Sequence, residues 1–542
     1  MNQNPSQTAV EGCASGREKT PIPPLWFRYF VPSVADLIFI VLFGAVTWGA
    51  LAPRLLGDAG IGWHIRNGEQ MLRMHAITRI DSFSFTMSGR PWYAWEWLYD
   101  VVIAGVHDRL GLNGVVFFTA LAIAATFALT LRLAVRRGAV LPVTVILLAL
   151  SISASTIHFF ARPHVLSWLF AAMWFQLLDS SEISSSRETD RRVLWLPVLM
   201  LLWVNLHGGF LLGFALLGLY LIAGLIRHSG SREGPKDATR QRLKHLGTVT
   251  VLSLLASLIN PYSYKLHLHV YQYLSNRWLM NHIDEFLSPN FHGVAQQCFA
   301  ALLLIAIVAL AIAPKKPQLS QLFVIIFAAY SGLYAARNLP VSSILLTLIV
   351  APLLSQVVVG AHTNPQLPPR LRAFFSRCES FTSRMGGMEL RFRGHLWPVA
   401  AVMLGLLVCL QHGKLGSRQL MDARFDAKRF PVQAAEVIAR RGIDQPIFTP
   451  DSWGGYLIYR LYPQTKVFVD DRHDLYGEQF LKDYLKVIRV APDWDKVLNE
   501  MHVDWVLVPA GSSLANMLRE TSQWTVIHED GTEVLFQRTK VL

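Results

Sequence analysis

Residues 112–133 read LNGVVFFTALAIAATFALTLRL, and Arg132 is the only charged residue in this run. A helix needs roughly 20 apolar residues to cross a bilayer, so the run predicts a transmembrane helix. The whole chain agrees, because 52% of its 542 residues are hydrophobic and 16% are charged. Soluble proteins average about 25% charged residues. We therefore expect an integral membrane protein with several such helices.

Similar apolar runs recur through residues 33–411, which we interpret as one transmembrane domain. The preceding residues 1–32 form a polar tail without the apolar core and cleavage site of a signal peptide. We predict about eleven helical spans, near residues 33–52, 112–133, 140–158, 164–178, 194–206, 208–226, 246–260, 294–313, 319–335, 339–358 and 395–411.

Positive charge sets the expected orientation, because Lys and Arg collect in cytoplasmic loops. With the N-terminal tail in the cytoplasm, an odd number of spans puts residues 412–542 outside, and we expect the inner (plasma) membrane. The net charge of +13 then belongs to loops, so nucleic acid is not an expected partner. The basic clusters on the predicted cytoplasmic side are Arg136/Arg137, Arg187/Arg191/Arg192, the run 227–244, Lys315/Lys316 and the run 370–393.

Residues 412–542 resemble a soluble domain, in which predicted strands and helices alternate as in a small α/β fold. Predicted strands are 445–449, 466–469, 505–508, 525–528 and 533–537, and predicted helices are 431–441, 453–461, 477–490, 494–501 and 514–520. The runs Asp451–Tyr456 and Asp470–Arg472 lie next to strand ends, where ligands bind in open sheets. The alternative is that Gly454 and Gly455 only permit close packing while Asp471 and Arg472 pair structurally.

The first predicted outer loop, residues 54–108, concentrates acidic, His and Trp residues. Asp58 follows a span end, and a carboxylate at an apolar boundary is a candidate general base, although Asp58 could instead cap the following helix. That helix is expected near 63–75, lying in the membrane interface. Further candidates in this loop are Glu96 and Asp100 as catalytic residues, His64 and Glu69 for substrate binding, and Trp92, Trp95 and Trp97 as an interfacial aromatic belt.

Other polar residues occupy short turns that should meet the loop on the same side of the membrane. Ionisable groups at membrane depth are costly and suggest function. The arginines could hold a phosphate by bidentate hydrogen bonds, or could extend to lipid headgroups. The substrate-binding candidates in these turns are Arg162, His164, His207, Arg337 and Asn338.

Metal chemistry receives little support from the four cysteines, because none lies near another in the sequence. No zinc site or disulfide framework is predicted. His267 and His269 are interpreted as interfacial residues. A divalent cation such as Mg²⁺ or Mn²⁺, held by carboxylates such as Asp58, remains an open alternative.

The loop sequence DAGIGWHIRNGEQMLRMHAITRIDSFSFTMSGRPWYAWEWLYD (58–100) resembles the first outer loop of bacterial GT-C-type membrane glycosyltransferases, a group similar to dolichyl-phosphate-mannose protein mannosyltransferases. WVNLHGGF (203–210), LINPYSY (258–264) and ARNLP (336–340) agree with the resemblance, which covers most of residues 33–542. It implies a polyprenyl-phosphate-linked sugar donor, an outward-facing site and a catalytic acidic residue at Asp58. Many members have a paired acidic motif there, whereas Ala59 follows Asp58 in this chain.

The resemblance leads us to expect an enzyme that moves a sugar from a polyprenyl-phosphate-linked donor to a glycan, lipid or protein acceptor on the outer face of the membrane. Membrane lipids are further expected partners. The alternatives are a non-catalytic assembly or docking protein and a transporter of lipid-linked sugars. A transporter should contain internal repeats and mid-span charges, and no repeat is evident in the sequence.

Overall fold

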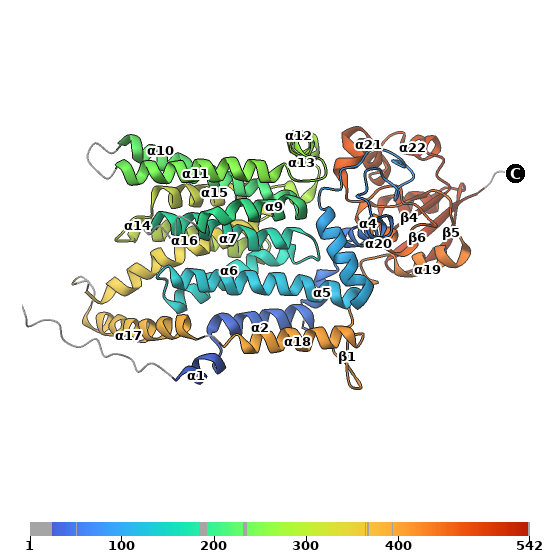
Figure 1. Ribbon diagram of the computed structural model, residues 1–542. Helices are drawn as coiled ribbons and strands as arrows, with labels where there is room; N and C mark the ends of the chain where they lie inside the picture. The colour runs from blue at the N-terminus through green and yellow to red at the C-terminus, as the bar shows by residue number, and fades with distance from the viewer. Residues whose placement is uncertain are drawn as a thin grey trace, which may run out of the picture.

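The computed structural model describes residues 24–49, 51–183, 192–230, 236–363, 365, 368–392 and 394–539. A long bundle of helices forms one part, and a smaller domain built around a sheet is attached at one end (Figure 1). We call the end of the bundle next to this domain the cavity end, and the opposite end the far end.

An α-helix covers each predicted span within the described residues. These helices are α2 (Val34–Thr47), α5 (Trp97–Arg136), α6 (Leu141–Ser155), α7 (His164–Ile183), α9 (Leu196–Leu206), α10 (Leu211–Gly230), α11 (Lys236–Ser257), α14 (Val294–Ile312), α15 (Leu319–Tyr334), α16 (Leu339–Gly360) and α18 (Leu396–Leu410). By length and composition, 6 helical segments of the described chain could cross a membrane, or up to 7 with one bent pair. The protein is therefore a multi-pass membrane protein, and the figure of about eleven spans stays a prediction.

Helix α5 is longer than a span because it continues past the bundle toward the small domain (Figure 1). Its backbone is interrupted at Gly111, where φ is 61°. Such a left-handed conformation carries little steric cost for glycine. The predicted span 112–133 starts just after this break, so the sequence located the apolar part of α5 and missed its polar extension.

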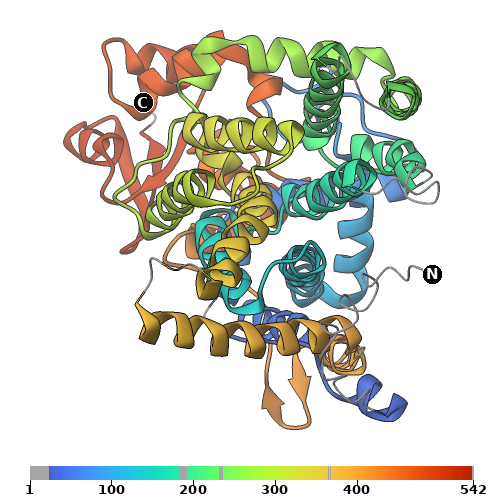
Figure 2. The same ribbon diagram turned by 90° about the vertical axis from the view of Figure 1, so that its left-hand side faces the viewer.

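The far end is crossed by α17 (Pro369–Arg391), which lies across the ends of the bundle helices (Figure 2). The short helix α1 (Leu25–Phe30) precedes α2 near this end. Ser33 begins α2 with a capping box, in which the side chains of Ser33 and Asp36 satisfy each other's backbone N–H groups. Most of the predicted N-terminal tail and the basic residues Arg187 and Arg191 lie outside the described residues.

The cavity end carries short helices between the spans. They are α3 (Ala52–Leu55), α4 (Gly60–Met74), α12 (Tyr264–Ser275) and α13 (Arg277–Met280), with 3₁₀ turns at 156–158, 208–210, 284–286 and 336–338. Two more 3₁₀ turns, at 193–195 and 361–363, lie at the far end. The helix expected near 63–75 is present as α4, and its place in the membrane interface stays a prediction, although Ile65 and Met71 are buried within the protein. It packs between the extension of α5 and helix α20 (Asp451–Leu461) of the small domain.

Glycines explain how closely α4 and α20 approach each other. A Cβ on Gly62 would overlap the carbonyl oxygen of Gly455, and a Cβ on Gly455 would overlap that of Ala59. A Cβ on Gly68 would likewise overlap the Asp100 carbonyl oxygen of α5. The interpretation of Gly455 as a close-packing residue is therefore correct, and the packing partner is the first loop.

The small domain contains a four-stranded sheet with the order β3-β4-β6-β5. Strand β3 pairs parallel with β4, and the other two pairings are antiparallel. Its elements are β3 (Ile447–Phe448), β4 (Trp505–Pro509), β5 (Trp524–Glu529), β6 (Glu533–Arg538), α19 (Val432–Arg441), α20, α21 (His473–Ile488), α22 (Trp494–Glu500) and α23 (Ser513–Glu520), and a hairpin of β1 (Lys414–Leu415) and β2 (Arg418–Gln419) precedes them.

Residues 466–469 differ from the predicted strand, because they form only isolated bridges. Val467 bridges to Ile447 of β3 and also to Ser84 of the first loop. The Val467 N–H donates to the Phe83 carbonyl at 3.1 Å, and the Phe85 N–H donates to the Val467 carbonyl at 3.1 Å. The first loop thus supplies backbone partners that a full strand would otherwise take from within the domain.

Candidate functional site

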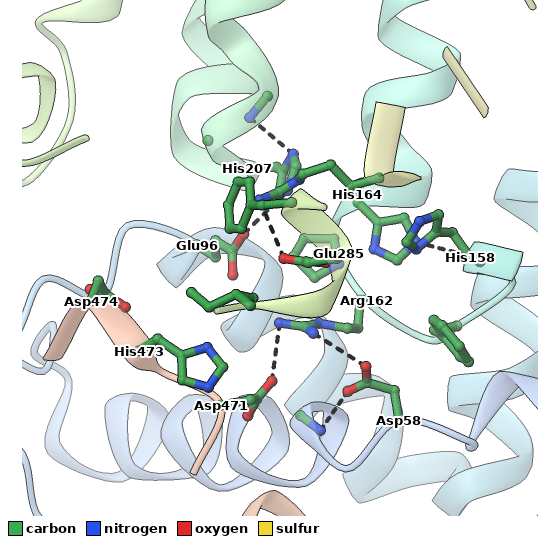
Figure 3. Close-up of a pocket in the computed structure, with 18 of the residues that line it drawn as sticks. Asp58, Glu96, His158, Arg162, His164, His207, Glu285, Asp471, His473 and Asp474 are labelled. Atoms are coloured by element: carbon green, nitrogen blue, oxygen red, sulfur yellow. Dashed lines mark hydrogen bonds and ion pairs between the residues drawn. The ribbon is translucent and has the colours of Figure 1, made fainter. Parts of the chain in front are cut away.

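A cavity of about 1090 Å³ lies at the cavity end, where the first loop, the turns between bundle helices and the small domain meet (Figure 3). Carboxylates, arginines and histidines from elements far apart in the sequence line it.

Arg162 lies at the centre, between two carboxylates (Figure 3). Its Nη1 is 3.2 Å from Oδ2 of Asp58, and its Nη2 is 3.1 Å from Oδ2 of Asp471. The Gly60 N–H donates to Oδ1 of Asp58 at 2.8 Å, and the Trp63 indole N–H donates to Oδ1 of Asp471 at 2.8 Å. Burial raises the pKa of Asp471 to about 6, against the opposing charge of Arg162. One guanidinium therefore joins a turn of the bundle, the first loop and the small domain.

Glu96 faces the cavity between two histidines. Its Oε2 is 3.7 Å from Nε2 of His64, and its Oε1 is 3.6 Å from Nε2 of His207. Neither distance is a hydrogen bond, and within the described chain the Glu96 carboxyl has no hydrogen-bond donor. Burial raises the pKa of Glu96 to about 8, although Arg162 and Arg337 act in the opposite direction. The carboxyl is therefore largely protonated at neutral pH and can take or give a proton there.

His64 is held behind Glu96 by its other ring nitrogen. Nδ1 of His64 is 2.5 Å from Oδ1 of Asp100, and Asn67 donates to Oδ2 of Asp100 at 2.6 Å. Burial, and after it the charge of Arg162, lowers the pKa of His64 well below its usual value. The ring is therefore neutral, and its buried Nε2, which has no hydrogen-bond partner, faces Glu96.

His207 also faces Glu96 through its Nε2 atom. The Gly209 N–H donates to Nδ1 of His207 at 3.0 Å, and the Ser167 hydroxyl is 2.8 Å from the same atom. Burial, with Arg337 and Arg162, lowers the pKa of His207 to about 3. The neutral ring therefore carries its proton on Nε2, the atom that faces Glu96. Glu96 therefore lies between the Nε2 atoms of two neutral histidines, and the Nε2 of His207 can donate a proton.

Two further arginines face the cavity in different states. Nη1 of Arg337 is 3.3 Å from Oε1 of Glu285. Burial raises the pKa of Glu285, but the charges of Arg337 and Arg162 outweigh burial and lower this pKa to about 2. Arg429 is exposed, lies against Gly57, and has no carboxylate partner within the described chain. Arg429 is therefore the cation of the cavity whose charge is least compensated.

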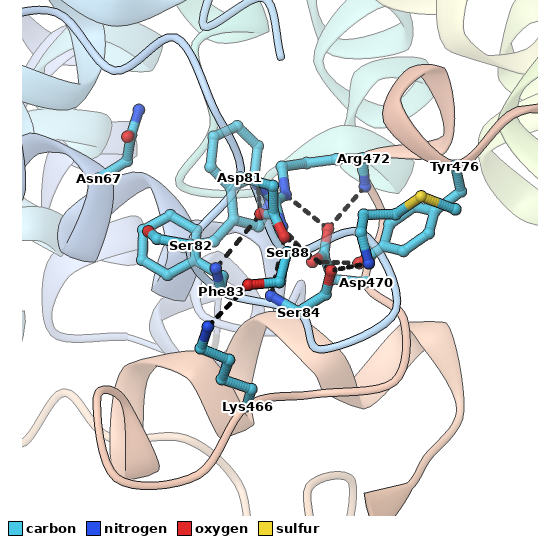
Figure 4. Close-up of polar contacts among 12 residues, drawn as sticks. Asn67, Asp81, Ser82, Phe83, Ser84, Ser88, Lys466, Asp470, Arg472 and Tyr476 are labelled. Carbon is cyan, nitrogen blue, oxygen red and sulfur yellow. Dashed lines mark hydrogen bonds and ion pairs between the residues drawn. The ribbon is translucent and has the colours of Figure 1, made fainter. Parts of the chain in front are cut away.

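The small domain contributes residues 471–474 to the cavity, and Arg472 anchors that segment (Figure 4). The buried guanidinium of Arg472 donates from Nε and Nη2 to the two oxygens of Asp470, at 2.8 and 2.6 Å. Its Nη1 is 2.8 Å from Oδ1 of Asp81 in the first loop, and it stacks over Trp92 at 4.6 Å. The structural pairing that we left open for Arg472 is present, while the neighbouring Asp471 points into the cavity (Figure 3).

The next residues of this segment also have partners. Nε2 of His473 is 3.0 Å from Oδ2 of Asp451. Burial alone would lower the pKa of His473, but the Asp451 carboxylate raises it. Asp474 pairs with His269 of α12 at 3.1 Å. His269, expected to be interfacial, instead ties α12 to the small domain.

Most of the predicted site residues converge on this cavity. Those that line it are Asp58, Glu96, Asp100, Arg162, His164, His207, Arg337 and Asn338, and His64 lies directly behind Glu96. The side chain of Asn338 donates to the Ser331 carbonyl at 3.2 Å, so its amide nitrogen serves the turn before α16. His164 bonds the carbonyl of His158 at 2.8 Å.

Glu69 is the exception among the predicted substrate-binding residues, because the structure places it away from the cavity. It pairs with Arg66 at 2.7 Å and lies 3.5 Å from His107, and it does not line the cavity. Five residues along a helix rotate a side chain by about 140°, which takes Glu69 away from the direction of His64.

The predicted aromatic belt needs correction. Trp92 is buried against Arg472, and the Trp97 indole donates to Asn205 at 2.8 Å. These tryptophans support the site from within. Glu285, Arg429 and His473 were not selected from the sequence, and Asp471 was selected only within the run Asp470–Arg472 of the small domain. The acidic and basic run 470–474 was the available signal, and its distance in sequence from the first loop concealed its role.

A divalent cation at Asp58 does not fit the residues present. The charge next to its Oδ2 is already the guanidinium of Arg162, and its Oδ1 accepts the Gly60 N–H. Within the described residues, no group of three His, Cys, Asp or Glu side chains converges around Asp58. Oxygen-rich coordination of Mg²⁺ or Mn²⁺ would require Arg162 to leave.

No protein-family model matches the chain, and no curated protein matches it. Solved structures do resemble it. The Archaeoglobus fulgidus oligosaccharyltransferase in the apo form matches with a TM-score of 0.55 and 11% identity over 88% of this chain and 69% of that chain. The archaeal oligosaccharyltransferase AglB from Archaeoglobus fulgidus, in complex with an inhibitory peptide and a dolichol-phosphate, matches with a TM-score of 0.54 and 9% identity over 94% and 74%.

ArnT from Cupriavidus metallidurans in the apo state gives a TM-score of 0.49 and 14% identity over 93% of this chain and 96% of that chain. The two oligosaccharyltransferase matches, with the helical bundle and the cavity at one end, determine the fold. The chain has the fold of the GT-C-type membrane glycosyltransferases.

Proposed function

We propose that the protein is a membrane glycosyltransferase that moves a sugar from a polyprenyl-phosphate-linked donor to a glycan, lipid or protein acceptor. The observation that carries this proposal is the cavity, in which arginines and a protonatable carboxyl face the same space at the end of a membrane bundle. The similar oligosaccharyltransferase that holds a dolichol-phosphate supports a lipid-linked donor.

The arginines suit the phosphate of such a donor, because guanidinium groups bind phosphate oxygens bidentately. Arg429 has an uncompensated charge and lies against Gly57, next to Asp58. Arg162 is occupied by Asp58 and Asp471, so a phosphate would compete with those carboxylates for its N–H groups. We assign phosphate binding to Arg429 and Arg162 together.

Glu96 is the carboxyl best suited to proton transfer. In the proposed step the acceptor hydroxyl oxygen forms a bond to the anomeric carbon of the sugar, and the bond from that carbon to the phosphate oxygen breaks. The polyprenyl phosphate leaves with the bonding electrons, and the hydroxyl proton passes to a base. A base with a pKa near the working pH is the most effective, and the pKa of about 8 favours Glu96. Asp58, already engaged by Arg162, would then position the phosphate-binding arginine.

The proposed reaction uses no metal ion, because the Arg162 guanidinium takes the place that a metal cation would occupy beside Asp58. A structure of the similar oligosaccharyltransferase with Zn and sulfate exists, so metal dependence is a direct test of this assignment. We expect turnover to survive removal of divalent cations by a chelator.

We further propose that the cavity and the residues 412–542 face the outside of the inner membrane, with the N-terminus in the cytoplasm. The distribution of Lys and Arg among the loops supports this orientation. A donor carried by a lipid suits such a site, because nucleotide sugars remain in the cytoplasm.

The test is binding of undecaprenyl phosphate to the purified full-length protein, compared with undecaprenol, which lacks the phosphate. We expect binding of the phosphate only, and a weakening of about tenfold or more in Arg429→Gln, since a charged hydrogen bond contributes about 1.5–3 kcal/mol. Arg277→Gln is the matched control, because Arg277 is an exposed arginine outside the cavity lining.

Equal binding of the phosphate and the alcohol would contradict a phosphate-directed site. Binding without any turnover of a panel of polyprenyl-phosphate sugars would favour the docking protein. Movement of a labelled lipid across proteoliposomes without sugar transfer would favour the transporter.

A further inference from the structure

The hairpin of β5 and β6 in the small domain brings together three side chains with metal-binding chemistry. His528 lies near the end of β5, Asp530 in the turn, and Glu533 at the start of β6. One potential ligand atom from each lies within 4.8 Å of the other two. The hairpin is separate from the cavity, since none of these residues lines it.

Backbone contacts occupy one oxygen of each carboxyl and leave the other available. Oε1 of Glu533 accepts the N–H groups of Gln433 and Ala434, both at 3.1 Å, where α19 begins. Oδ1 of Asp530 accepts the N–H groups of Thr532 and Glu533, at 2.7 and 2.9 Å. Both carboxyls are therefore fixed in orientation, and their second oxygens are not used by the backbone.

Two of the remaining atoms are buried without a hydrogen-bond partner. These are Oε2 of Glu533, a residue only 1% exposed, and Nε2 of His528. Buried polar atoms without partners are rare, and each suggests an unseen proton, water or ion. The pairing of β5 with β6 also shifts register between Val526 and His528. A bulge of this kind redirects the following side chain and is common beside functional sites.

We propose that His528, Asp530 and Glu533 bind a divalent transition metal ion, of which Zn²⁺ is the best example. One imidazole nitrogen and two carboxylate oxygens are ordinary zinc ligands, and a water would complete a tetrahedral site. Donors bound to one zinc ion at about 2.1 Å each lie at most about 4 Å apart, so only small side-chain movements are required. The ion would tie the hairpin to the first turn of α19. The cysteines gave no hint of this site, because it uses none of them.

The alternative is that the two carboxyls share a proton. A shared proton would satisfy the buried Oε2 of Glu533 without any ion. The stability of the protein would then not depend on zinc, so a zinc-dependent change in stability separates the two explanations.

The experiment is titration of the chelator-treated full-length protein with ZnCl₂ in detergent, followed by calorimetry and thermal unfolding. We expect the wild type to bind one Zn²⁺ more than Glu533→Gln or His528→Gln, and zinc to raise the unfolding temperature of the wild type alone. Glu529→Gln is the matched control, because this exposed carboxylate on the same hairpin pairs with Arg519 and is outside the trio.

His528→Gln keeps the test decisive if Glu533→Gln does not fold, since His528 is only partly buried. Equal zinc stoichiometry and equal thermal shifts in the wild type and His528→Gln would overturn the proposal. The readout is binding and stability, so the result is independent of whether the protein transfers sugars.

Discussion

Buried charges occur at both ends of the bundle, but their partners differ. At the far end, Asp179 takes a salt bridge of 2.5 Å from Arg137 and hydrogen bonds from Tyr220 and Gln321. Glu182, also at the far end, contacts Arg227, Arg242 and Ser320. At the cavity end, Glu96 lies between two neutral histidines without any hydrogen-bond donor to its carboxyl in the described chain.

The difference separates a structural role from a chemical one. A carboxylate whose oxygens are all engaged by cations and donors, such as that of Asp179, holds helices together. A buried carboxyl that faces an open cavity with few partners has a displaced pKa and is available for proton transfer. We therefore assign helix fastening to the far end and catalysis to the cavity end, and the following predictions test that division.

The largest effect should come from Glu96→Gln, which removes the proposed base and keeps the shape of the side chain. We expect sugar transfer to fall by about 10²- to 10⁴-fold, the usual contribution of general base catalysis, while binding of undecaprenyl phosphate is kept. Steady-state transfer by the purified protein is the measurement. Glu69→Gln, in the same loop but outside the cavity, should retain full activity, and an active Glu96→Gln would remove this residue from the mechanism.

Asp179→Asn should lower the stability of the protein without changing ligand binding in the cavity. It leaves Arg137 buried without its counter-charge, and breaking a buried pair costs about 3–5 kcal/mol. Denaturant unfolding in detergent should show this loss, while the folded fraction binds undecaprenyl phosphate as the wild type does. Asp422→Asn, at an exposed pair with Arg424, should show no measurable change. Loss of undecaprenyl phosphate binding in folded Asp179→Asn would contradict the assignment of a purely structural role to the far end.

Arg472→Lys tests whether the small domain positions the cavity residues. Lysine cannot make the paired contacts to Asp470 or stack on Trp92 in the same way, so Asp471 and His473 should shift. We expect transfer to fall by roughly 10- to 100-fold, because small displacements of a site have effects of this order. A double-mutant cycle with Asp81→Asn should show strong coupling, and additive effects would mean that the domain is anchored elsewhere.

The smallest effect is the pH dependence of transfer. Glu96 is protonated below its pKa of about 8 and ionised above it, so the base becomes available as the pH rises. The rate should therefore increase by about tenfold per unit below pH 8 and level off above it. His207, with a pKa of about 3, stays neutral throughout and adds no second limb. A flat wild-type profile between pH 6.5 and 8.5, an interval of about two units, would contradict the role of Glu96.

The sequence predicted the helices and most of the cavity because both depend on local patterns. The apolar runs determine the spans, and Arg162, His207 and Arg337 stand out as ionisable residues in short turns between them. Their convergence follows once the spans alternate in direction. The extension of α5 before Gly111 was missed, since it packs against α4, and its His107 contacts the Tyr459 hydroxyl of α20 at 3.0 Å.

The contribution of the small domain could not be predicted in this way. Asp471 reaches Arg162 across more than three hundred residues of sequence, and that approach depends on tertiary contacts such as the Arg472 anchor, the backbone contacts of Val467 and the packing of α4 on α20. The far end shows the same limit. Arg137, Arg227 and Arg242 were interpreted as topological charges, and their pairing with Asp179 and Glu182 depends on helix packing.

We propose that the cavity end faces the outside of the membrane and carries out sugar transfer. The most direct measurement places single cysteines at each end, by Ser522→Cys in the small domain and Lys315→Cys between α14 and α15, in a protein whose native cysteines are replaced by serine. Intact cells are then treated with a membrane-impermeant maleimide. We predict labelling at position 522 and protection at 315 until the cells are lysed. Labelling at 315 with protection at 522 would put the cavity in the cytoplasm and contradict the proposed reaction.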